Sequence, residues 1–164
     1  ELLGALGRIG ASSALIGGLA LAPYRVVRAT MDVDLLADGD VADAIDAEMR
    51  RLGYGRLHRS IDSATFVRGD ERVDFLFAHR PMAKALLAAA VEHSTPFGAL
   101  RVVSLEGLVA FKLQGLVNDP RRTQDLEDIR ALLRANRDRI SRDQLRDYFR
   151  LFGKEDLLEQ LLAE

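Results

Sequence analysis

Residues 31–36 have the sequence MDVDLL, whose alternation of apolar and acidic residues is typical of a β-strand. On a strand, residues two apart point to the same side, so Asp32 and Asp34 project together, opposite the apolar residues. Two carboxylates about 4 Å apart repel by roughly 4 kcal/mol at an effective dielectric constant near 20. This strand therefore needs either a compensating cation or a solvated position.

A third acidic residue lies within an apolar hairpin. Residues 63–68 and 71–77 are rich in β-forming side chains, and Gly69-Asp70 between them is a two-residue hairpin signal. In the second strand the apolar residues share one face and Asp74 lies on the other. A charge in the middle of an apolar strand is costly unless something compensates it.

Two interpretations of the three acids remain open. Carboxylates that converge from two strands suit Mg²⁺, which prefers hard oxygen ligands. Alternatively, Asp32, Asp34 and Asp74 lie on the solvated faces of edge strands, with Asp32 paired to Arg28 or Arg72.

A glycine pair precedes the first acidic strand. The apolar run 14–16 predicts a buried strand that ends at Gly17-Gly18, and thirteen residues separate this pair from Asp32. Glycines between a strand and a helix let backbone N–H groups approach a phosphate closely. The alternative is a plain tight turn.

The remaining pattern predicts a mixed α/β core over residues 1–103 and helices over 104–164 that pack on it. We expect further elements: helices over 1–10, 40–52 and 82–92, a short helix broken near Pro23, and an extended segment over 97–103. In the C-terminal part, Ser104 and Ser141 are candidate helix N-caps, and Asp119-Pro120 is a candidate N-cap followed by proline at the first helical position.

Composition excludes several classes of protein. The chain of 164 residues is 48% apolar and has no cysteine, which excludes disulfide scaffolds, thiolate zinc sites and cysteine nucleophiles. No run of 18 apolar residues exists, so we expect neither a membrane span nor a membrane partner. The net charge of −2 means that nucleic-acid binding would need a local patch. Because the first residue is Glu1, we expect the native chain to begin upstream.

The C-terminal helices carry charged residues, some of which have two interpretations. Lys112 lies on an apolar helix, where it either extends to solvent or meets an anion. Asp125 and Asp128 share a helix face in the first turns of their helix, where the helix dipole favours acids. Residues 121–150 hold nine arginines and six acids, either a salt-bridged surface or a surface for RNA phosphates. The histidines have no ligand spacing and we expect surface or packing roles for them: His58, His79 and His93.

Taken together, these residues resemble the DNA polymerase β-like nucleotidyltransferase superfamily. The superfamily pattern is a Gly-Gly or Gly-Ser pair, a spacer, a D-x-D strand and a later acid, here Gly17-Gly18, Asp32, Asp34 and Asp74. A closer likeness is to AbiEii-type toxins and related small bacterial nucleotidyltransferases. The segments that carry it are Gly17-Gly18-Leu19-Ala20, Arg28-Ala29-Thr30, Lys112-Leu113 and Asp125-Leu126-Glu127-Asp128. The chain departs from this pattern at Gln124, where such families often have lysine. Its C-terminal part is also short compared with that of full-length toxins of this kind.

The resemblance implies an α+β nucleotidyltransferase fold with a mixed sheet and a C-terminal helical bundle. It implies catalysis by Asp32, Asp34 and Asp74, which would also hold Mg²⁺ or Mn²⁺. It assigns nucleotide binding to Gly17, Gly18, Arg28, Thr30, Lys112 and Asp125. It also implies that Asp125 and Asp128 form part of the site wall, where they would pair with Lys112. From the residues alone, Arg28 either reaches a phosphate or braces Asp32.

The implied activity is metal-dependent transfer of a nucleoside monophosphate from a nucleoside triphosphate to a hydroxyl of RNA, such as tRNA, or of a protein. The resemblance also suggests a cytoplasmic bacterial toxin with a cognate antitoxin. Two alternatives remain: a catalytically silent protein of the same fold that binds a nucleotide or a partner protein, and a helical interaction module in which the acids are incidental.

Overall fold

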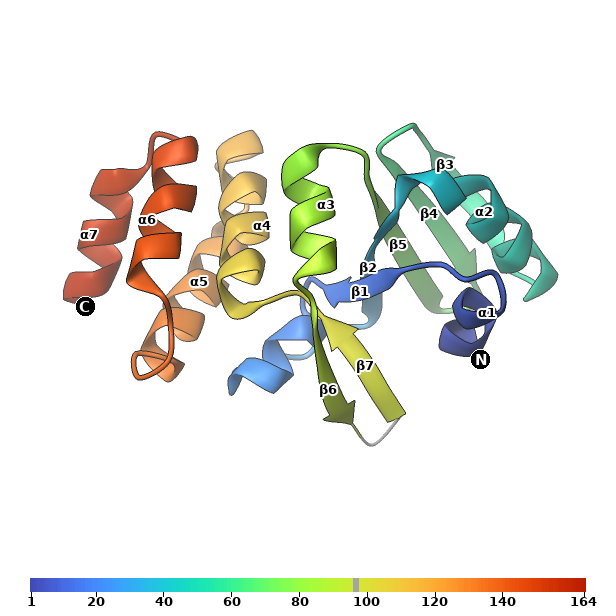
Figure 1. The fold of residues 1–164 in the computed structure, drawn as a ribbon, viewed down its shortest axis with the longest axis horizontal. Helices are drawn as coiled ribbons and strands as arrows, with labels where there is room; N and C mark the ends of the chain where they lie inside the picture. Colours follow the sequence, from blue (N-terminus) through green and yellow to red (C-terminus); the bar gives the residue numbers. More distant parts are fainter. Residues whose placement is uncertain (96–97) are drawn as a thin grey trace. The chain divides into compact units, whose positions relative to one another are not determined.

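The computed structural model describes residues 1–95 and 98–164, which form two compact units. The sheet unit comprises Glu1–Leu19 and Ala29–Val103, and the helical unit comprises Ala20–Arg28 and Ser104–Glu164 (Figure 1). Residues 20–28, which we expected in the α/β core, therefore group with the C-terminal helices.

The sheet unit is built on one mixed seven-stranded sheet with the order β3-β4-β5-β2-β1-β7-β6. The strands are β1 (Ser13–Ile16), β2 (Asp32–Asp38), β3 (Gly55–Arg59), β4 (Ser63–Arg68), β5 (Glu71–Ala78), β6 (Val91–Thr95) and β7 (Gly98–Val102). Central strand β2 runs antiparallel to β1 and parallel to β5. The expected mixed α/β class and the 63–77 hairpin are confirmed.

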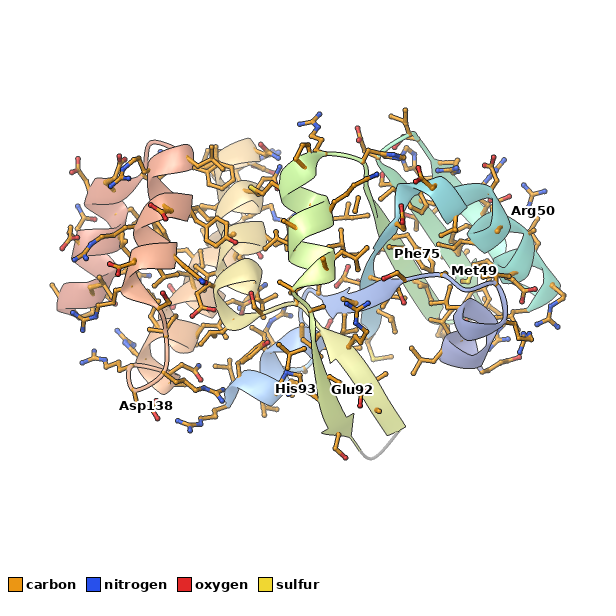
Figure 2. The ribbon with its side chains drawn as sticks, viewed as in Figure 1. Met49, Arg50, Phe75, Glu92, His93 and Asp138 are labelled. Carbon is orange, nitrogen blue, oxygen red and sulfur yellow. The ribbon has the colours of Figure 1, made fainter. Side chains whose placement is uncertain are left out.

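The apolar core of the sheet unit explains the alternation of buried and exposed residues along β5. The helical segments of this unit are α1 (Leu2–Arg8), η2 (Gly39–Val41), α2 (Ala42–Arg51) and α3 (Pro81–Ala88). On β5, Val73, Phe75 and Phe77 are buried whereas Asp74 is only half-buried, as the alternation predicts. Phe75 and Met49 of α2, both labelled in Figure 2, are completely buried. Burial of each such side chain contributes about 1.5–3 kcal/mol.

The helical unit contains α4 (Leu105–Asn118), α5 (Thr123–Ala135), α6 (Arg142–Leu151), α7 (Glu155–Ala163) and most of the 3₁₀ segment η1 (Leu19–Tyr24). Asn136, which is fully buried, donates from Nδ2 to the Tyr24 carbonyl oxygen at 2.9 Å and to that of Leu132 at 2.8 Å. This amide ties η1 to the C-terminal end of α5.

Two helix caps are confirmed. The hydroxyl of Ser104 accepts from the Gly107 N–H at 3.2 Å, and that of Ser141 accepts from the Gln144 N–H at 3.4 Å.

The expected start at Asp119-Pro120 is wrong, because α5 begins at Thr123. The Asp119 carboxylate instead accepts from the Arg121 N–H at 3.1 Å and closes a turn after α4.

The helix expected over residues 82–92 is wrong in its last part, which belongs to strand β6. The helix ends at Ala88, and Val91–Thr95 pairs antiparallel with Gly98–Val102. Pairing with a strand outside the window overrides the local helical pattern. Strand β3 was not expected, because its sequence shows no alternation of apolar and polar residues. In the structure its residues are almost all exposed. Residue 97 of the expected extended segment lies outside the described residues.

Candidate active site

The three acids of the predicted site are brought together by the pairing of β2 with β5. Asp34 is the register partner of Asp74, and Asp32 is the partner of Arg72. Neighbouring strands lie about 4.8 Å apart and directly paired residues point to the same face. The carboxylates of Asp34 and Asp74 are therefore neighbours, with Asp32 two residues along the same face.

Gly17 lies beside this acidic row. Strand β1 ends at Ile16, the register partner of Asp34, and Gly17 follows with a φ of +66°. A Cβ atom at position 17 would overlap the Asp34 carboxylate. Glycine is thus required twice, for its left-handed backbone and for the space that Asp34 occupies. Gly18 is buried in the same turn.

Asp74 is held by two side chains of the hairpin. The Arg72 guanidinium donates from Nε to Asp74 Oδ2 at 2.7 Å and from Nη2 to Oδ1 at 3.2 Å. The Thr65 hydroxyl donates to Oδ1 at 2.5 Å. The hydrogen bonds to Asp74 raise the pKa of Arg72, and the negative charges of Asp32 and Asp34 act in the same direction.

The acidic row fits a divalent cation in the chemistry of its donors. Carboxylate oxygens are the hard ligands that Mg²⁺ and Mn²⁺ prefer, and the small Gly17 keeps a side chain away from Asp34. Across residues 1–95 and 98–164, no group of three or more His, Cys, Asp or Glu side chains is arranged closely enough to hold a metal ion. Asp74 also carries a two-point contact from the Arg72 guanidinium.

Lys112 is the centre of a buried ion-pair cluster in the helical unit. Its side chain is 5% exposed, and Nζ lies 2.6 Å from Asp128 Oδ2 and 3.2 Å from Asp125 Oδ1. The lysine therefore does not extend to solvent, and its ammonium contacts two carboxylates of α5. A phosphate contact by Lys112 stays a prediction.

Three further side chains complete the cluster around the two aspartates. Arg122 Nε lies 2.6 Å from Asp125 Oδ2, Gln124 donates to Asp128 Oδ1 at 3.0 Å, and Arg28 Nε lies 3.2 Å from the same oxygen. Burial raises the pKa of Asp128, but hydrogen bonds and charge from Lys112, with Gln124 and Arg28, outweigh it, so this pKa lies below its usual range. Asp128 therefore remains charged while buried.

The remaining sequence-predicted positions are placed as follows. Thr30 is half-buried in the irregular segment before β2. His79 lies against Ile61, with Nε2 2.8 Å from its carbonyl oxygen. His58 is an exposed residue of β3, and its register partner is Thr65 of β4.

The arginine-rich stretch forms many internal ion pairs. Six of the nine arginines of residues 121–150 pair with acids of the helical unit, namely Arg121, Arg122, Arg130, Arg134, Arg146 and Arg150. The salt-bridged surface is therefore confirmed.

Sequence reasoning missed Thr65 as a partner of Asp74. The signal was present, because a two-residue turn at Gly69-Asp70 pairs Arg68 with Glu71. Counting back from that pair places Thr65 directly opposite Asp74.

Among the described residues, no helix combines the length and the apolar character needed to cross a bilayer.

No protein-family model and no curated protein sequence matches the chain, whereas several solved structures do. The chain is similar to the antibiotic-resistance factor ANT(2'')-Ia in solution, with a TM-score of 0.72 and 17% identity over 97% of this chain and 91% of that chain. A crystal structure of ANT(2'')-Ia in complex with adenylyl-2''-tobramycin gives a TM-score of 0.71 and 17% identity over 94% of each chain.

A third similar structure is the lincosamide antibiotic adenylyltransferase LnuA with bound lincomycin. Its TM-score is 0.58 at 13% identity, over 80% of this chain and 91% of that chain. The expected nucleotidyltransferase fold is confirmed by these matches, and the narrower AbiEii-type likeness is not shown by them.

Proposed function

We propose that this protein is a nucleotidyltransferase that transfers a nucleoside monophosphate from a nucleoside triphosphate to a hydroxyl group. The observation that carries the proposal is the register of β2 and β5, which places Asp34 beside Asp74 and Asp32 on the same face. The space reserved for Asp34 at Gly17 supports it, because the acidic row and the glycine turn are built as one site.

Each part of this site has a chemical task in the proposal. The hydroxyl oxygen of the acceptor bonds to the α-phosphorus while the bond to the leaving pyrophosphate breaks. Asp74 orients this hydroxyl and accepts its proton, and the backbone N–H groups of the Gly17-Gly18 turn would bind the triphosphate. Mg²⁺ or Mn²⁺, held by Asp32, Asp34 and Asp74, would supply charge stabilisation to the phosphate oxygens. Nucleotide contact stays a prediction for Arg28, Thr30, Lys112 and Asp125.

We propose a small hydroxylated molecule as the acceptor. The support is the similarity to ANT(2'')-Ia and LnuA, whose structures contain adenylyl-2''-tobramycin and lincomycin, over most of both chains. The internal pairing of six arginines leaves less free positive charge for RNA. An RNA or protein acceptor, with a toxin role and an antitoxin partner, is the alternative that the same experiment tests.

The test combines nucleotide binding with product detection. Calorimetric titration of each of the four nucleoside triphosphates with Mg²⁺ or Mn²⁺ is followed by incubation with α-labelled nucleotide and with aminoglycosides, lincosamides, tRNA or protein. We expect metal-dependent binding and a labelled small-molecule product, both lost in Asp34→Asn. Asp43→Asn is the control, because it removes one carboxylate that is fully exposed on α2.

Three outcomes separate the candidates. Label on tRNA or protein in place of the small molecules overturns the acceptor and supports the toxin role. Nucleotide binding with no transfer to any acceptor supports the catalytically silent protein. Absence of nucleotide binding under every metal condition contradicts the proposed activity itself.

A further inference from the structure

Arg72 engages both oxygens of Asp74 in a two-point contact. Nε and Nη2 reach Oδ2 and Oδ1 at 2.7 and 3.2 Å, and Thr65 adds a third donor at Oδ1. Arginine–carboxylate pairs with two parallel hydrogen bonds are among the stronger polar contacts in proteins. One of the three carboxylates proposed to hold the cation therefore already has a cationic partner from the protein.

The position of Arg72 makes it a counter-ion for the whole acidic row. It is the register partner of Asp32 and lies two residues before Asp74, so it shares the face that carries all three acids. The charges of Asp32 and Asp34 also stabilise its protonated form. The guanidinium thus offsets part of the repulsion between three neighbouring carboxylates.

The same contact competes with a metal ion. A divalent cation bonds to carboxylate oxygens at about 2.0–2.1 Å for Mg²⁺ and repels a guanidinium that bonds to the same oxygens. The Arg72 side chain is 46% exposed and that of Asp74 is 25% exposed, so the guanidinium has solvent into which it can turn. Thr65, a neutral donor, can remain on Oδ1 while Arg72 leaves.

We propose that Arg72 is a positioning residue that holds Asp74 in the metal-free protein and releases it when a divalent cation binds. This proposal rests on the proposed function, in which Asp32, Asp34 and Asp74 hold that cation. Arg72 therefore weakens metal binding, and without a metal ion it offsets the repulsion between the three carboxylates.

The experiment measures Mn²⁺ binding by the electron paramagnetic resonance signal of free Mn²⁺, on the whole chain at low ionic strength. We expect Arg72→Met to bind Mn²⁺ about five- to tenfold more tightly than the wild type, because the metal no longer displaces a charge-assisted hydrogen bond. Arg72→Lys, which keeps the charge, should stay near the wild type. Far-UV circular dichroism checks folding, and Arg72→Gln replaces Arg72→Met if the latter does not fold.

The chain contains a matched control in Arg121. It also pairs through two nitrogens with an aspartate two residues before it, with Nε 2.9 Å from Asp119 Oδ1 and Nη2 3.2 Å from Oδ2. Arg121→Met therefore makes the same change of net charge and of contact type outside the acidic row, and we expect it to leave Mn²⁺ affinity unchanged.

A second background, Asp74→Asn, distinguishes two reasons for tighter Mn²⁺ binding by Arg72→Met: the release of Asp74 and the general loss of a positive charge. If Arg72→Met tightens Mn²⁺ binding in the wild-type background and not in the Asp74→Asn background, the proposal holds. An equal gain in both backgrounds, or no gain in a wild type that does bind Mn²⁺, overturns it and leaves the proposed function intact. If the wild type and every variant fail to bind Mn²⁺ with or without nucleotide, both proposals are overturned together.

Discussion

Replacement of Lys112 by methionine tests the buried ion-pair cluster most directly. The ammonium is 5% exposed and lies 2.6 and 3.2 Å from carboxylates of Asp128 and Asp125, which are themselves 4% and 8% exposed. Lys112→Met preserves most of the side-chain volume and removes the charge together with the hydrogen-bond donors of the ammonium. Because it leaves buried carboxylates without their central partner, we expect a loss of about 3–5 kcal/mol in the free energy of unfolding.

The pH dependence of this loss gives a second readout. In the wild type the lowered pKa of Asp128 contributes stability that is present above the pKa of the unfolded chain, about 3.9, and is lost as pH falls through the folded value. In Lys112→Met, burial remains without the ammonium, so we expect the pKa of Asp128 to rise from its wild-type position, with Gln124 and Arg28 still lowering it. Acidification from about pH 7 to about pH 3 then protonates this carboxyl in the variant before it does so in the wild type, which reduces the difference between the two.

The assay is urea denaturation followed by far-UV circular dichroism at both pH values. Lys84→Met is the control, since Lys84 is half exposed and lies 3.9 Å from an exposed Asp40, a pair worth about 1 kcal/mol or less. Asp128→Asn added to Lys112→Met should recover part of the loss, because one uncompensated charge disappears. A loss below about 1 kcal/mol for Lys112→Met would refute the reasoning, as would a difference that grows on acidification.

Two further predictions concern the glycine turn and the buried tyrosine of η1. Gly17→Ala and Gly69→Ala both force a left-handed backbone on alanine, at φ of +66° and +57°. In urea denaturation Gly69→Ala should lower the free energy of unfolding by about 1–2 kcal/mol, and Gly17→Ala should lower it further because its Cβ also overlaps Asp34. Calorimetry should show loss of metal-dependent nucleotide binding in Gly17→Ala alone, because only there does the new Cβ displace Asp34; equal binding by both variants contradicts the proposed site. Burial, followed by the charge of Glu106, raises the pKa of Tyr24 from 10.0 to about 12. The stability that comes from this raised pKa is complete below pH 10 and is lost as pH rises through the folded value. The free energy of unfolding should therefore fall between pH 10 and 12, by less than the roughly 2–3 kcal/mol of the full shift because solvent screens part of it, and it should fall less in Tyr24→Phe.

Much of the acidic row could be predicted from local sequence. Alternation in residues 31–36 placed Asp32 and Asp34 on one face, and the two-residue turn at Gly69-Asp70 determined which residues of the hairpin oppose each other. Both features depend on interactions within a few residues, for which strand periodicity and turn geometry are sufficient.

Other elements were beyond local reasoning because their partners lie far away in sequence. Strand β6 was interpreted as the end of a helix, since its pairing with β7 outweighs its own pattern. Arg28 had plausible partners at Asp32 and at a phosphate, and the structure pairs it with Asp128, one hundred residues later.

The sequence by itself therefore determined that this protein has an acidic strand pair, a glycine turn before it and a helical C-terminal part. Short-range geometry decides these features, because a residue's face on a strand or its role as a cap depends on its immediate neighbours. Only the tertiary structure decided that β2 pairs with β5 in the register that joins Asp34 to Asp74, and that Lys112 is neutralised by α5. Which distant groups compensate a buried or crowded charge depends on how the whole chain packs, and no local pattern carries that information.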